Sequence, residues 1–382
     1  MAEPRPKNIE RIVVRGANWV GDAVMTVPAL RELRRLFPKT RITLATRSWA
    51  RGLFADADFL DELQVHDGTG LRSVVQQVRE WRRHDFDLAV LFPNSLEAAL
   101  VAALSSVPLR IGYASYGRQR LLTHPLTLPE WRGTRHEVFY YLQIVAELEW
   151  RIKGQETFLA TEPNSSLEVS DARASAAIDL VRSKGVIECR TLIALCPGSI
   201  NSRAKRWPAE RYAALADRLI EEIDAQVILI GSAAEVEVSL EVTERMRNKP
   251  VVLTGKTDLA ELVAVLGLVN LLITNDTGPA HIAAALGRPT LVIFGPTNVA
   301  TTRPFSPLAE IVVHPPECAP CMLRDCPIDH RCMTAISPDD VFDRARTVLE
   351  TSAGQWRRNE NSANVALPLD GHYRTERGSA GC

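Results

Sequence analysis

The sequence predicts an α/β protein with two doubly wound parallel sheets. Short, continuous apolar runs alternate along the chain with amphipathic helical segments, a pattern typical of parallel strands that helices cover on both faces. The composition, 46% hydrophobic and 24% charged, supports a large core. A chain of 382 residues is longer than a single hydrophobic core usually serves. We therefore expect two Rossmann-like domains, each with its own sheet.

The apolar runs locate the expected strands. In the first half they lie at 11–15, 41–46, 87–92 and 110–113. In the second half they lie at 191–196, 226–230, 251–254, 271–274, 290–294 and 311–313. A polar, turn-prone stretch at 162–170 separates the two series, so we place an N-terminal domain at 1–168 and a C-terminal domain at 169–353. Residues 354–382 lack periodicity and are expected to form a disordered tail.

Charge and hydropathy argue against several classes of protein. The formal net charge is −1, so nothing global indicates nucleic-acid binding. The first 150 residues carry a slight excess of basic over acidic residues, which suits a small anionic ligand better than a duplex. The chain shows neither an apolar leader nor a run of about 18 uncharged apolar residues, so we expect a cytoplasmic protein without a transmembrane segment.

The loops that follow the strands should carry the function, because open α/β sheets bind ligands at the carboxyl ends of their strands. The first such loop, residues 15–22, matches neither the dinucleotide glycine motif nor a P-loop. It ends in Asp22, a carboxylate at a helix start that could accept a proton from a sugar hydroxyl. The alternative is an N-cap aspartate that only satisfies backbone amides.

Two loops of the second half suit a phosphorylated ligand. The loop 196–208 combines small residues such as Ser199 with three cations that include Lys205, which matches a diphosphate. Its alternative is a solvated basic loop. The turn 231–235 brings in Glu235, which could accept hydrogen bonds from ribose hydroxyls, unless this is an ordinary strand-to-helix turn.

The stretch 271–297 contains a further anion site. An apolar strand breaks into Asn-Asp-Thr-Gly-Pro before an alanine-rich helix, which places polar groups at a helix N-terminus. Asp276, Thr277 and Gly278 are expected to meet phosphate or ribose. His281 lies one turn beyond Thr277 and could donate to a phosphate oxygen; a purely structural histidine is the alternative.

Together these motifs resemble the lipopolysaccharide ADP-heptosyltransferase family (glycosyltransferase family 9), and within it most closely the heptosyltransferase II group. The resemblance spans about residues 9–350 and rests on four segments in the right order: Gly21-Asp22, Lys205-x-Trp207-Pro208, the turn 231–235, and Asp276-Thr277-Gly278-x-x-His281. It implies a GT-B architecture, in which two Rossmann-like domains face a cleft. The N-terminal domain would take the acceptor and the C-terminal domain ADP-heptose.

The resemblance also implies a reaction. This is the inverting transfer of L-glycero-D-manno-heptose from ADP-heptose to the heptosyl-Kdo2-lipid A inner core during lipopolysaccharide biosynthesis. Asp22 matches the family's proposed catalytic base, and Lys205 matches the lysine that faces the donor diphosphate. The implied donor site comprises Ser199, Lys205, Glu235, Asp276, Thr277, Gly278 and His281.

The implied acceptor is anionic and lies at the cytoplasmic face of the inner membrane, so the protein would be cytoplasmic or peripheral to that membrane. Arginines of the first half are the candidates to bind it: Arg47, Arg51, Arg118, Arg120 and Arg135. The resemblance implies no catalytic cofactor, because cations stabilise the leaving group. Asp56-Ala57-Asp58 and Asp85-Phe86-Asp87 fit the Asp-x-Asp pattern of metal-dependent transferases, but neither lies at a convincing place between the elements.

Four cysteines fall within 15 residues: Cys318, Cys321, Cys326 and Cys332. This density is typical of a zinc or cluster site, and a structural zinc ion would pin a long loop, but the spacing matches no common zinc template and argues against it. A loop of free or partly oxidised thiols is the alternative.

Three other functions stay open. They are a heptosyltransferase of another core position, a GT-B nucleotide-sugar epimerase, and a non-catalytic ADP-sugar-binding protein. An epimerase needs acid and base groups on both faces of the sugar, and the sequence offers one good candidate, Asp22. A binding protein has no need of Asp22.

Overall fold

The computed structural model describes residues 9–154, 162–187 and 190–360. The chain divides into two compact units. Unit 1 comprises Met1–Glu168 together with Val299–Ser306, and unit 2 comprises Val169–Asn298 and Pro307–Cys382. Each unit has its own six-stranded sheet.

Unit 1 has the strand order β3-β2-β1-β4-β5-β6, with every pair parallel. Its strands are β1 (Arg11–Arg15), β2 (Arg41–Thr46), β3 (Glu62–Val65), β4 (Leu88–Leu91), β5 (Leu109–Tyr113) and β6 (His124–Leu126). Its helices are α1 (Val20–Met25), α2 (Val27–Leu36), α3 (Ala50–Leu53), α4 (Gly70–His84), α5 (Leu96–Leu104), η1 (Arg118–Leu121), α6 (Glu137–Lys153) and α12 (Val299–Thr302).

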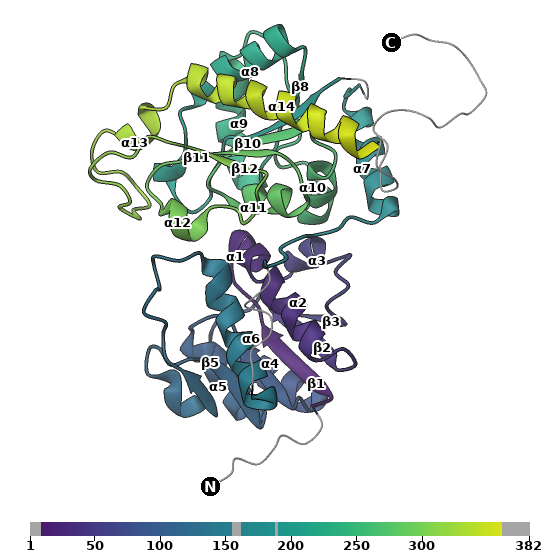
Figure 1. The fold of residues 1–382 in the computed structure, drawn as a ribbon, viewed down its shortest axis with the longest axis vertical. Helices are drawn as coiled ribbons and strands as arrows, with labels where there is room; N and C mark the ends of the chain where they lie inside the picture. The colour runs from purple at the N-terminus through teal and green to yellow at the C-terminus, as the bar shows by residue number, and fades with distance from the viewer. Residues whose placement is uncertain (1–8, 155–161, 188–189, 361–382) are drawn as a thin grey trace, which may run out of the picture. The chain divides into compact units, whose positions relative to one another are not determined.

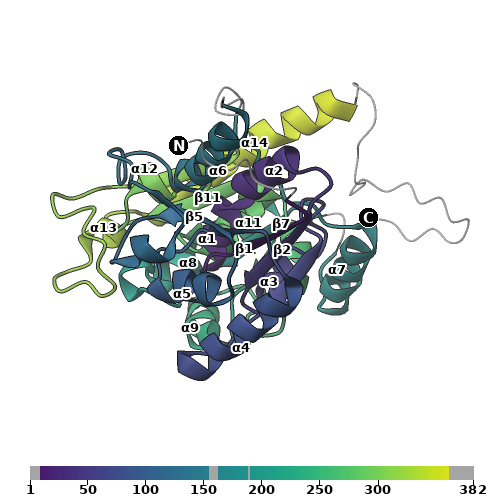
Figure 2. The same ribbon diagram turned by 90° about the horizontal axis from the view of Figure 1, so that it is seen from below.

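Helices cover both faces of this sheet. α2 and α6 lie side by side (Figures 1 and 2). α4 and α5 pack on the opposite face, against Val13, Ala45 and Ala89. The strand order reverses between β1 and β4, and this switch point is where open α/β sheets bind ligands.

Unit 2 repeats this topology with the order β12-β11-β10-β7-β8-β9, again all parallel. Its strands are β7 (Leu192–Cys196), β8 (Gln226–Leu229), β9 (Val251–Val252), β10 (Leu271–Asn275), β11 (Thr290–Phe294) and β12 (Ala309–Val313). Its helices are α7 (Asp171–Ser183), η3 (Arg203–Lys205), α8 (Ala209–Ile223), η4 (Ala233–Glu235), α9 (Val236–Arg245), α10 (Leu259–Leu266), α11 (Gly278–Ala285), α13 (Arg331–Thr334) and α14 (Pro338–Glu360). α14 packs along α8 (Figure 1), and the switch point lies between β7 and β10.

The predicted fold class is confirmed, since both units are Rossmann-like doubly wound parallel sheets. The short edge strands β3 and β6 were not predicted. They have the sequences ELQV and HPL, and neither contains the continuous apolar run by which the other strands were identified. The first helix is broken at Thr26, where α1 ends and α2 begins. Pro28 has no N–H to donate to the carbonyl of Val24, so one continuous helix cannot form there.

The segment Val299–Ser306 departs from the predicted domain boundary. The sequence analysis placed it in the C-terminal domain, but it packs with unit 1. The Nε2 of His136 donates to the carbonyl of Arg303 (2.6 Å), and the rings of His136 and Phe305 lie 5.0 Å apart. Ser165 donates to the carbonyl of Phe305 (2.8 Å). These contacts are long-range in the chain, so local patterns could not have shown them.

The C-terminal end also differs from the prediction. α14 continues to Glu360, so residues 354–360 are helical where the sequence analysis began a disordered tail. The rest of the predicted tail, 361–382, lies outside the described residues. Across the part of the chain that the structure describes, no helix has the length and apolar character needed to span a bilayer.

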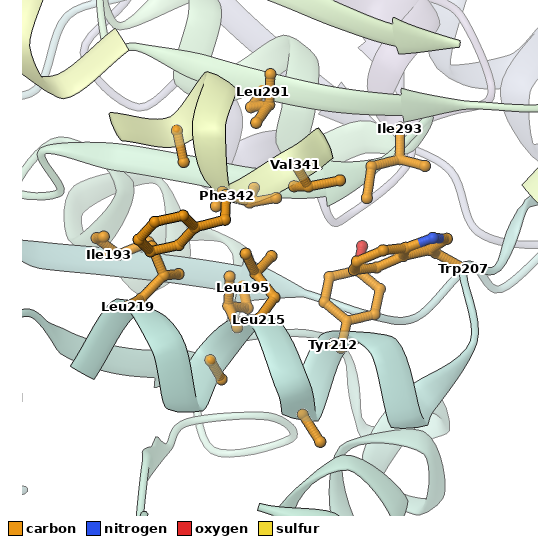
Figure 3. Packing of buried hydrophobic residues seen from close by; sticks show 14 of the residues in the cluster. Ile193, Leu195, Trp207, Tyr212, Leu215, Leu219, Leu291, Ile293, Val341 and Phe342 are labelled. Atoms are coloured by element: carbon orange, nitrogen blue, oxygen red, sulfur yellow. The ribbon is translucent and has the colours of Figure 1, made fainter. Parts of the chain in front are cut away.

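Trp207 and Tyr212 anchor the core of unit 2 (Figure 3). Both rings are buried and meet edge to face, with centroids 5.0 Å apart. The indole N–H of Trp207 donates to the carbonyl of Ile336 (3.0 Å), so its burial leaves no donor unpaired. Burial of each ring stabilises the fold by about 1.5–3 kcal/mol. Trp207 thereby fixes the C-terminal end of the loop before α8 to the core.

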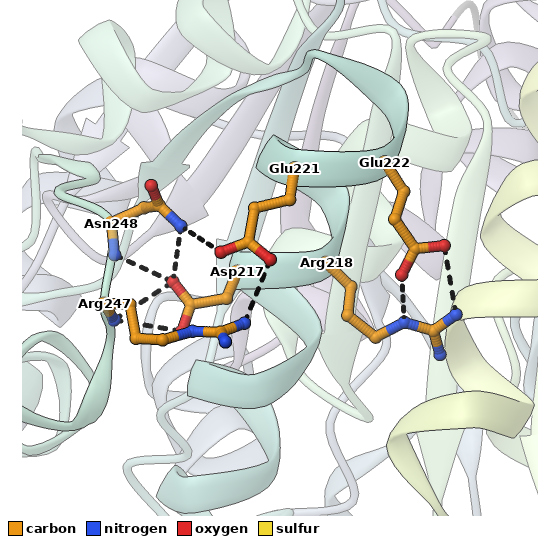
Figure 4. A network of polar contacts seen from close by, with 6 residues as sticks. All are labelled: Asp217, Arg218, Glu221, Glu222, Arg247 and Asn248. Atoms are coloured by element: carbon orange, nitrogen blue, oxygen red, sulfur yellow. Dashed lines mark hydrogen bonds and ion pairs between the residues drawn. The ribbon is translucent and has the colours of Figure 1, made fainter.

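A polar network joins α8 to the turn after α9 (Figure 4). The buried carboxylate of Asp217 accepts hydrogen bonds from the backbone N–H groups of Arg247 (2.9 Å) and Asn248 (2.8 Å), and from the side chain of Asn248 (3.1 Å). Burial by itself would raise the pKa of Asp217, but these hydrogen bonds outweigh it and the pKa lies below its usual value. The charged form of Asp217 therefore stabilises unit 2.

Asp217→Asn is expected to lower the free energy of unfolding of unit 2 by about 1–3 kcal/mol near neutral pH, because an amide cannot accept all of these bonds. A carboxyl whose pKa falls on folding stabilises the fold above its ordinary pKa of about 4, and this contribution is lost as the pH falls through the lowered value. The difference between variant and parent should therefore shrink below about pH 4. Urea unfolding followed by circular dichroism at several pH values measures it.

Glu222→Gln is the matched control on the same helix. Glu222 pairs with Arg218 at the surface (2.6 Å), so loss of its charge should change the free energy of unfolding much less at every pH (Figure 4). An equal loss in both variants, or a loss in Asp217→Asn that does not depend on pH, would contradict the role given to the buried network.

Candidate functional site

Asn275 joins the two loops that leave the switch point of unit 2. Its side chain is fully buried at the end of β10. The Nδ2 donates to the carbonyls of Pro197 (2.8 Å) and Gly198 (3.1 Å). The Oδ1 accepts from the backbone N–H of Trp207 (3.0 Å) and from the hydroxyl of Tyr212 (3.1 Å). One amide thus fixes both ends of the loop 197–207.

Lys205 lies on this loop, in η3, and is held by Asp276. Its Nζ donates to the Oδ2 of Asp276 (2.7 Å) and to the carbonyl of the same residue (3.2 Å). Thr297 donates to the same Oδ2 (2.7 Å). An ammonium group carries three N–H donors, so these contacts leave one for a ligand. The side chain of Lys205 is 25% exposed, which keeps that cation accessible.

Asp276 has a structural role that the sequence analysis did not give it. Its side chain is about 5% exposed, and its Oδ2 is occupied by Lys205 and Thr297. This geometry gives it the role of holding Lys205, and its contact with phosphate or ribose stays a prediction.

Glu235 is buried in the turn after β8. Its Oε2 accepts hydrogen bonds from the backbone N–H of Ser232 (2.8 Å) and from the hydroxyl of Ser232 (2.9 Å), which forms a capping box. The other oxygen, Oε1, packs against Gly198, where any side chain would collide with it. The ordinary strand-to-helix turn is therefore present, and a ribose contact by Glu235 stays a prediction.

Ser199 is also buried, and its carbonyl accepts hydrogen bonds from the guanidinium of Arg206 (3.0 and 3.2 Å). One cation of the loop 196–208 is thus used inside the loop itself. The simple alternative of a solvated basic loop does not describe this geometry, because Lys205 and Arg206 are both held by specific partners.

Thr277, Gly278 and His281 lie at the start of α11. Thr277 is the N-cap, and its hydroxyl lies 3.1 Å from that of Thr274. Thr277 and Gly278 are half-buried, whereas His281 is 5% exposed. The helix start carries a partial positive charge. Thr277 and Gly278 are therefore the better placed of the three for contact with an anion, and the roles of all three stay predictions.

The cysteine-rich segment packs against the turn that carries Lys205. The backbone N–H of Ala204 donates to the carbonyl of Arg324 (2.9 Å), and the hydroxyl of Ser202 donates to the same oxygen (3.1 Å). The Nε2 of His330 donates to the carbonyl of Ala204 (2.5 Å). A segment predicted to be structural therefore braces η3 from the side of β12.

None of the four cysteines forms a disulfide in the part of the chain that the structure describes. Cys318 and Cys321 are exposed, Cys326 is half-buried and Cys332 is buried. Burial, followed by the neighbouring thiols, raises the pKa of Cys332. Within residues 9–154, 162–187 and 190–360, no three His, Cys, Asp or Glu side chains are arranged to hold a metal ion. Zinc binding at these cysteines stays a prediction.

Asp22 follows β1, next to the switch point of unit 1. It lies in the first turn of α1, whose N-cap is Trp19, and no side-chain cap bond forms there. The N-cap alternative for Asp22 is therefore wrong. Burial, and then the charge of Asp22, raise the pKa of Tyr141, which places the carboxylate near that phenol.

Arg118 is wrong as an acceptor-binding candidate. It is fully buried, and its guanidinium donates to the carbonyls of Tyr113 (2.8 Å) and Ser95 (3.3 Å) and to the side chain of Asn94 (3.1 Å). It ties β5 to the loop after β4. Because it is fully buried and its guanidinium already has these acceptors, it is part of the structure of unit 1 and is not available to an acceptor.

The other four candidate arginines keep exposed surface. Arg51 and Arg120 are exposed. The guanidinium of Arg135 lies 3.7 Å from the ring centre of Phe139. Arg47 donates to the carbonyl of Asp67 (3.0 Å). Their contact with an acceptor stays a prediction.

The sequence analysis placed Asn275 and Thr297 within the anion-site stretch 271–297 but did not predict their hydrogen bonds, and it gave no role to His330. Asn275 and Thr297 stand at or just beyond the ends of apolar strands, and that position is a signal that could have identified them. No local signal marks His330, because its contact with Ala204 spans 126 positions of the chain.

Two Rossmann-type units, one with a lysine-bearing loop at its switch point and the other with a carboxylate there, define a glycosyltransferase of the GT-B class. The chain belongs to glycosyltransferase family 9 (heptosyltransferase), whose sequence pattern matches residues 74–331. The predicted family and enzyme class are confirmed.

Named relatives agree with this assignment. The lipooligosaccharide heptosyltransferase 2 of Haemophilus influenzae is 29% identical over 317 residues, which cover 79% of this chain and 88% of the relative. The structure of E. coli ADP-heptose lipopolysaccharide heptosyltransferase II matches with a TM-score of 0.77 and 26% identity, over 90% of this chain and all of the other. A family 9 glycosyltransferase from Veillonella parvula matches with a TM-score of 0.79 and 26% identity, over 90% of this chain and 98% of the other. The chain is thus a heptosyltransferase-family enzyme, similar to heptosyltransferase II.

His330→Ala is expected to loosen the turn that carries Lys205, because the carbonyl of Ala204 loses its hydrogen bond from the imidazole. Loss of one hydrogen bond corresponds to about a 2- to 10-fold faster amide exchange in residues 202–206. Hydrogen–deuterium exchange followed by mass spectrometry measures this rate in the free protein.

Asp325→Asn is the control in the same segment. It removes an exposed ion pair with Arg203 (2.7 Å) but leaves the backbone contact of Arg324 in place, so exchange should not change. Unaltered exchange in His330→Ala would show that His330 does not brace this turn.

Proposed function

We propose that the protein transfers L-glycero-D-manno-heptose from ADP-heptose to the heptosyl-Kdo2-lipid A inner core, with inversion at the anomeric carbon. The observation that carries the proposal is the lysine site of unit 2, where Asp276 holds the ammonium of Lys205 at the switch point (2.7 Å). A fixed cation at this place suits a sugar diphosphate leaving group. The similarity to E. coli ADP-heptose lipopolysaccharide heptosyltransferase II supports the choice of donor and acceptor.

In the proposed mechanism, Asp22 removes the proton from an acceptor heptose hydroxyl. The oxygen attacks the anomeric carbon of the donor, the bond from that carbon to the diphosphate oxygen breaks, and ADP leaves with the electron pair. Lys205 and the start of α11 stabilise the negative charge that grows on the diphosphate. The products are the extended acceptor, ADP and the proton now held by Asp22.

The ion pair of Lys205 with Asp276 has a function in this mechanism. A buried carboxylate keeps the ammonium in one position before the donor binds, so little reorganisation is needed in the transition state. The lipid-anchored acceptor further implies that the enzyme works at the inner face of the membrane.

Asp22→Asn is expected to lower kcat by about 10²- to 10⁴-fold with little change in donor binding, because the amide cannot take the proton. The assay incubates purified protein with ADP-heptose and a defined heptosyl-Kdo2-lipid A acceptor, and quantifies product and ADP by mass spectrometry. Asp58→Asn is the matched control, since Asp58 is an exposed carboxylate of unit 1 that pairs with Arg31. It should retain full activity.

The same assay separates the alternatives. Transfer by Asp22→Asn at the parental rate would remove Asp22 as the base. Conversion of ADP-heptose without any acceptor would favour an epimerase. Binding of ADP-heptose with no turnover on any inner-core acceptor would favour a binding protein, and product on a different core acceptor would assign another position.

Transfer is expected to survive an excess of EDTA, because Lys205 and the start of α11 supply the positive charge that a divalent ion supplies in metal-dependent transferases. Initial rates with and without EDTA measure this. Activity that is lost with EDTA and restored by Mg²⁺ or Mn²⁺ would contradict the metal-free mechanism.

Metal analysis of the same samples tests the cysteine-rich segment separately. We propose zinc at these thiols only as a structural ion, so one equivalent of zinc that EDTA removes without loss of rate would support it. Protein that is fully active without stoichiometric zinc or iron would leave the cysteines as free thiols.

A further inference from the structure

An arginine or histidine lies at the carboxyl end of each of three neighbouring strands of unit 1. β3, β2 and β1 lie next to one another and run parallel, so their carboxyl ends share one edge of the sheet. Arg15 is the last residue of β1, Arg47 follows β2 directly, and His66 follows β3 directly. β1 also borders β4 at the switch point, where ligands bind to sheets of this type.

Arg15 is buried without a full set of partners. The residue is 5% exposed, yet its Nη1 is buried and has no hydrogen-bond partner among the described residues. Its Nη2 lies 3.6 Å from the Oε1 of Glu97, which is beyond hydrogen-bond length. Burial, partly offset by Glu97 and reinforced by Arg47, lowers the pKa of Arg15 to about 10. A buried cation with an unpaired donor is costly unless an anion binds to it.

Arg47 adds a second guanidinium beside the first. Its Nη1 donates to the carbonyls of Asp67 (3.0 Å) and His66 (3.4 Å), so the loop after β3 orients it. Burial, and then the charges of Arg15 and Arg47, lower the pKa of His66 to about 3. The imidazole is therefore neutral at physiological pH and does not add charge of its own.

The nearby carboxylates do not replace a ligand. The side chain of Glu97 is 41% exposed and stays solvated. Asp67 is exposed, and its Oδ1 accepts the backbone N–H of Ser48 (2.9 Å). Neither carboxylate reaches the Nη1 of Arg15. This donor therefore lacks an acceptor, and an additional anionic oxygen would supply one.

We propose that Arg15 and Arg47 form a subsite for one anionic group, a carboxylate or a phosphate, of the acceptor substrate. The proposal rests on the proposed function for the identity of that substrate. Arg15 ends β1, and Asp22 lies in the first turn of α1, the next helix. An anion bound to Arg15 would therefore anchor the acceptor at the same edge of the sheet as the proposed base. Two guanidinium groups suit the forked geometry of either group.

Arg15→Gln is expected to raise the KM for the acceptor by about 10- to 100-fold, while kcat and the KM for ADP-heptose change by less than about 3-fold. Arg47→Gln should act in the same direction and provides a second test if Arg15→Gln fails to fold, which circular dichroism shows. Arg11→Gln is the matched control, because Arg11 lies at the opposite end of β1 and donates to the carbonyl of His84 (2.7 Å). Its kinetics should equal those of the parent, and an unchanged acceptor KM in both Arg15→Gln and Arg47→Gln would overturn the proposal.

A probe that does not depend on turnover separates this site from the proposed function. Inorganic phosphate and acetate should each raise the thermal unfolding temperature of the parent and of Arg11→Gln more than that of Arg15→Gln. This Arg15-dependent shift without any transfer would support the subsite and contradict the proposed function. Transfer without the shift, and with an unchanged acceptor KM, would contradict the subsite alone.

Two modified acceptors identify the anionic group. If the parent and Arg15→Gln have equal KM values on a dephosphorylated acceptor but not on a carboxyl-reduced one, the subsite binds phosphate. The reverse result assigns the carboxylate. A KM difference that persists unchanged on an acceptor lacking both groups would overturn the anion subsite, because Arg15 would then act without an anion.

Discussion

The buried amide of Asn275 is the constraint on which the lysine site of unit 2 depends. The loop 197–207 leaves the sheet at β7, turns through η3 and enters the core at Trp207. Asn275 accepts from one end of this loop and donates to the other, with its four contacts between 2.8 and 3.1 Å. Each backbone group left unpaired in such a buried position would cost about 1–3 kcal/mol. A hydroxyl or apolar side chain could not supply both donors and acceptor, so an amide is required.

Lys205 is positioned by elements on both sides of this loop. Asp276, just after β10, accepts a hydrogen bond from the ammonium group of Lys205, and Thr297, after β11, donates to the same carboxylate. The cysteine-rich segment holds the turn through Ala204. A buried ion pair contributes little net stability, because desolvation offsets most of the attraction. The ion pair between Lys205 and Asp276 instead fixes the position of the ammonium group. The cation has one position before any ligand arrives, which is what stabilisation of a leaving group requires.

Arg118 and Arg15 are two buried arginines of unit 1 whose guanidinium groups differ in how fully they are paired. Both are buried, and burial lowers the pKa of each to about 10. Arg118 finds acceptors on Tyr113, Ser95 and Asn94, so it is part of the structure. Arg15 has a distant carboxylate and an unpaired nitrogen. Burial is common to both residues, so it is the unpaired donor that makes Arg15, and not Arg118, the residue for which we propose an anionic ligand.

The sequence by itself determined the two parallel sheets, because period and length of apolar runs are local properties of the chain. It also located the loops with Asp22, Lys205 and Asp276, since functional loops follow strands. It did not determine which polar groups point at a ligand and which bind each other. Asp276 holding Lys205, Glu235 capping its own turn, and Arg118 fixing β5 all depend on partners that the chain brings together only on folding. Tertiary structure decided these roles because a hydrogen bond depends on distance in space, and His330 and Ala204, 126 positions apart, meet only in the folded unit.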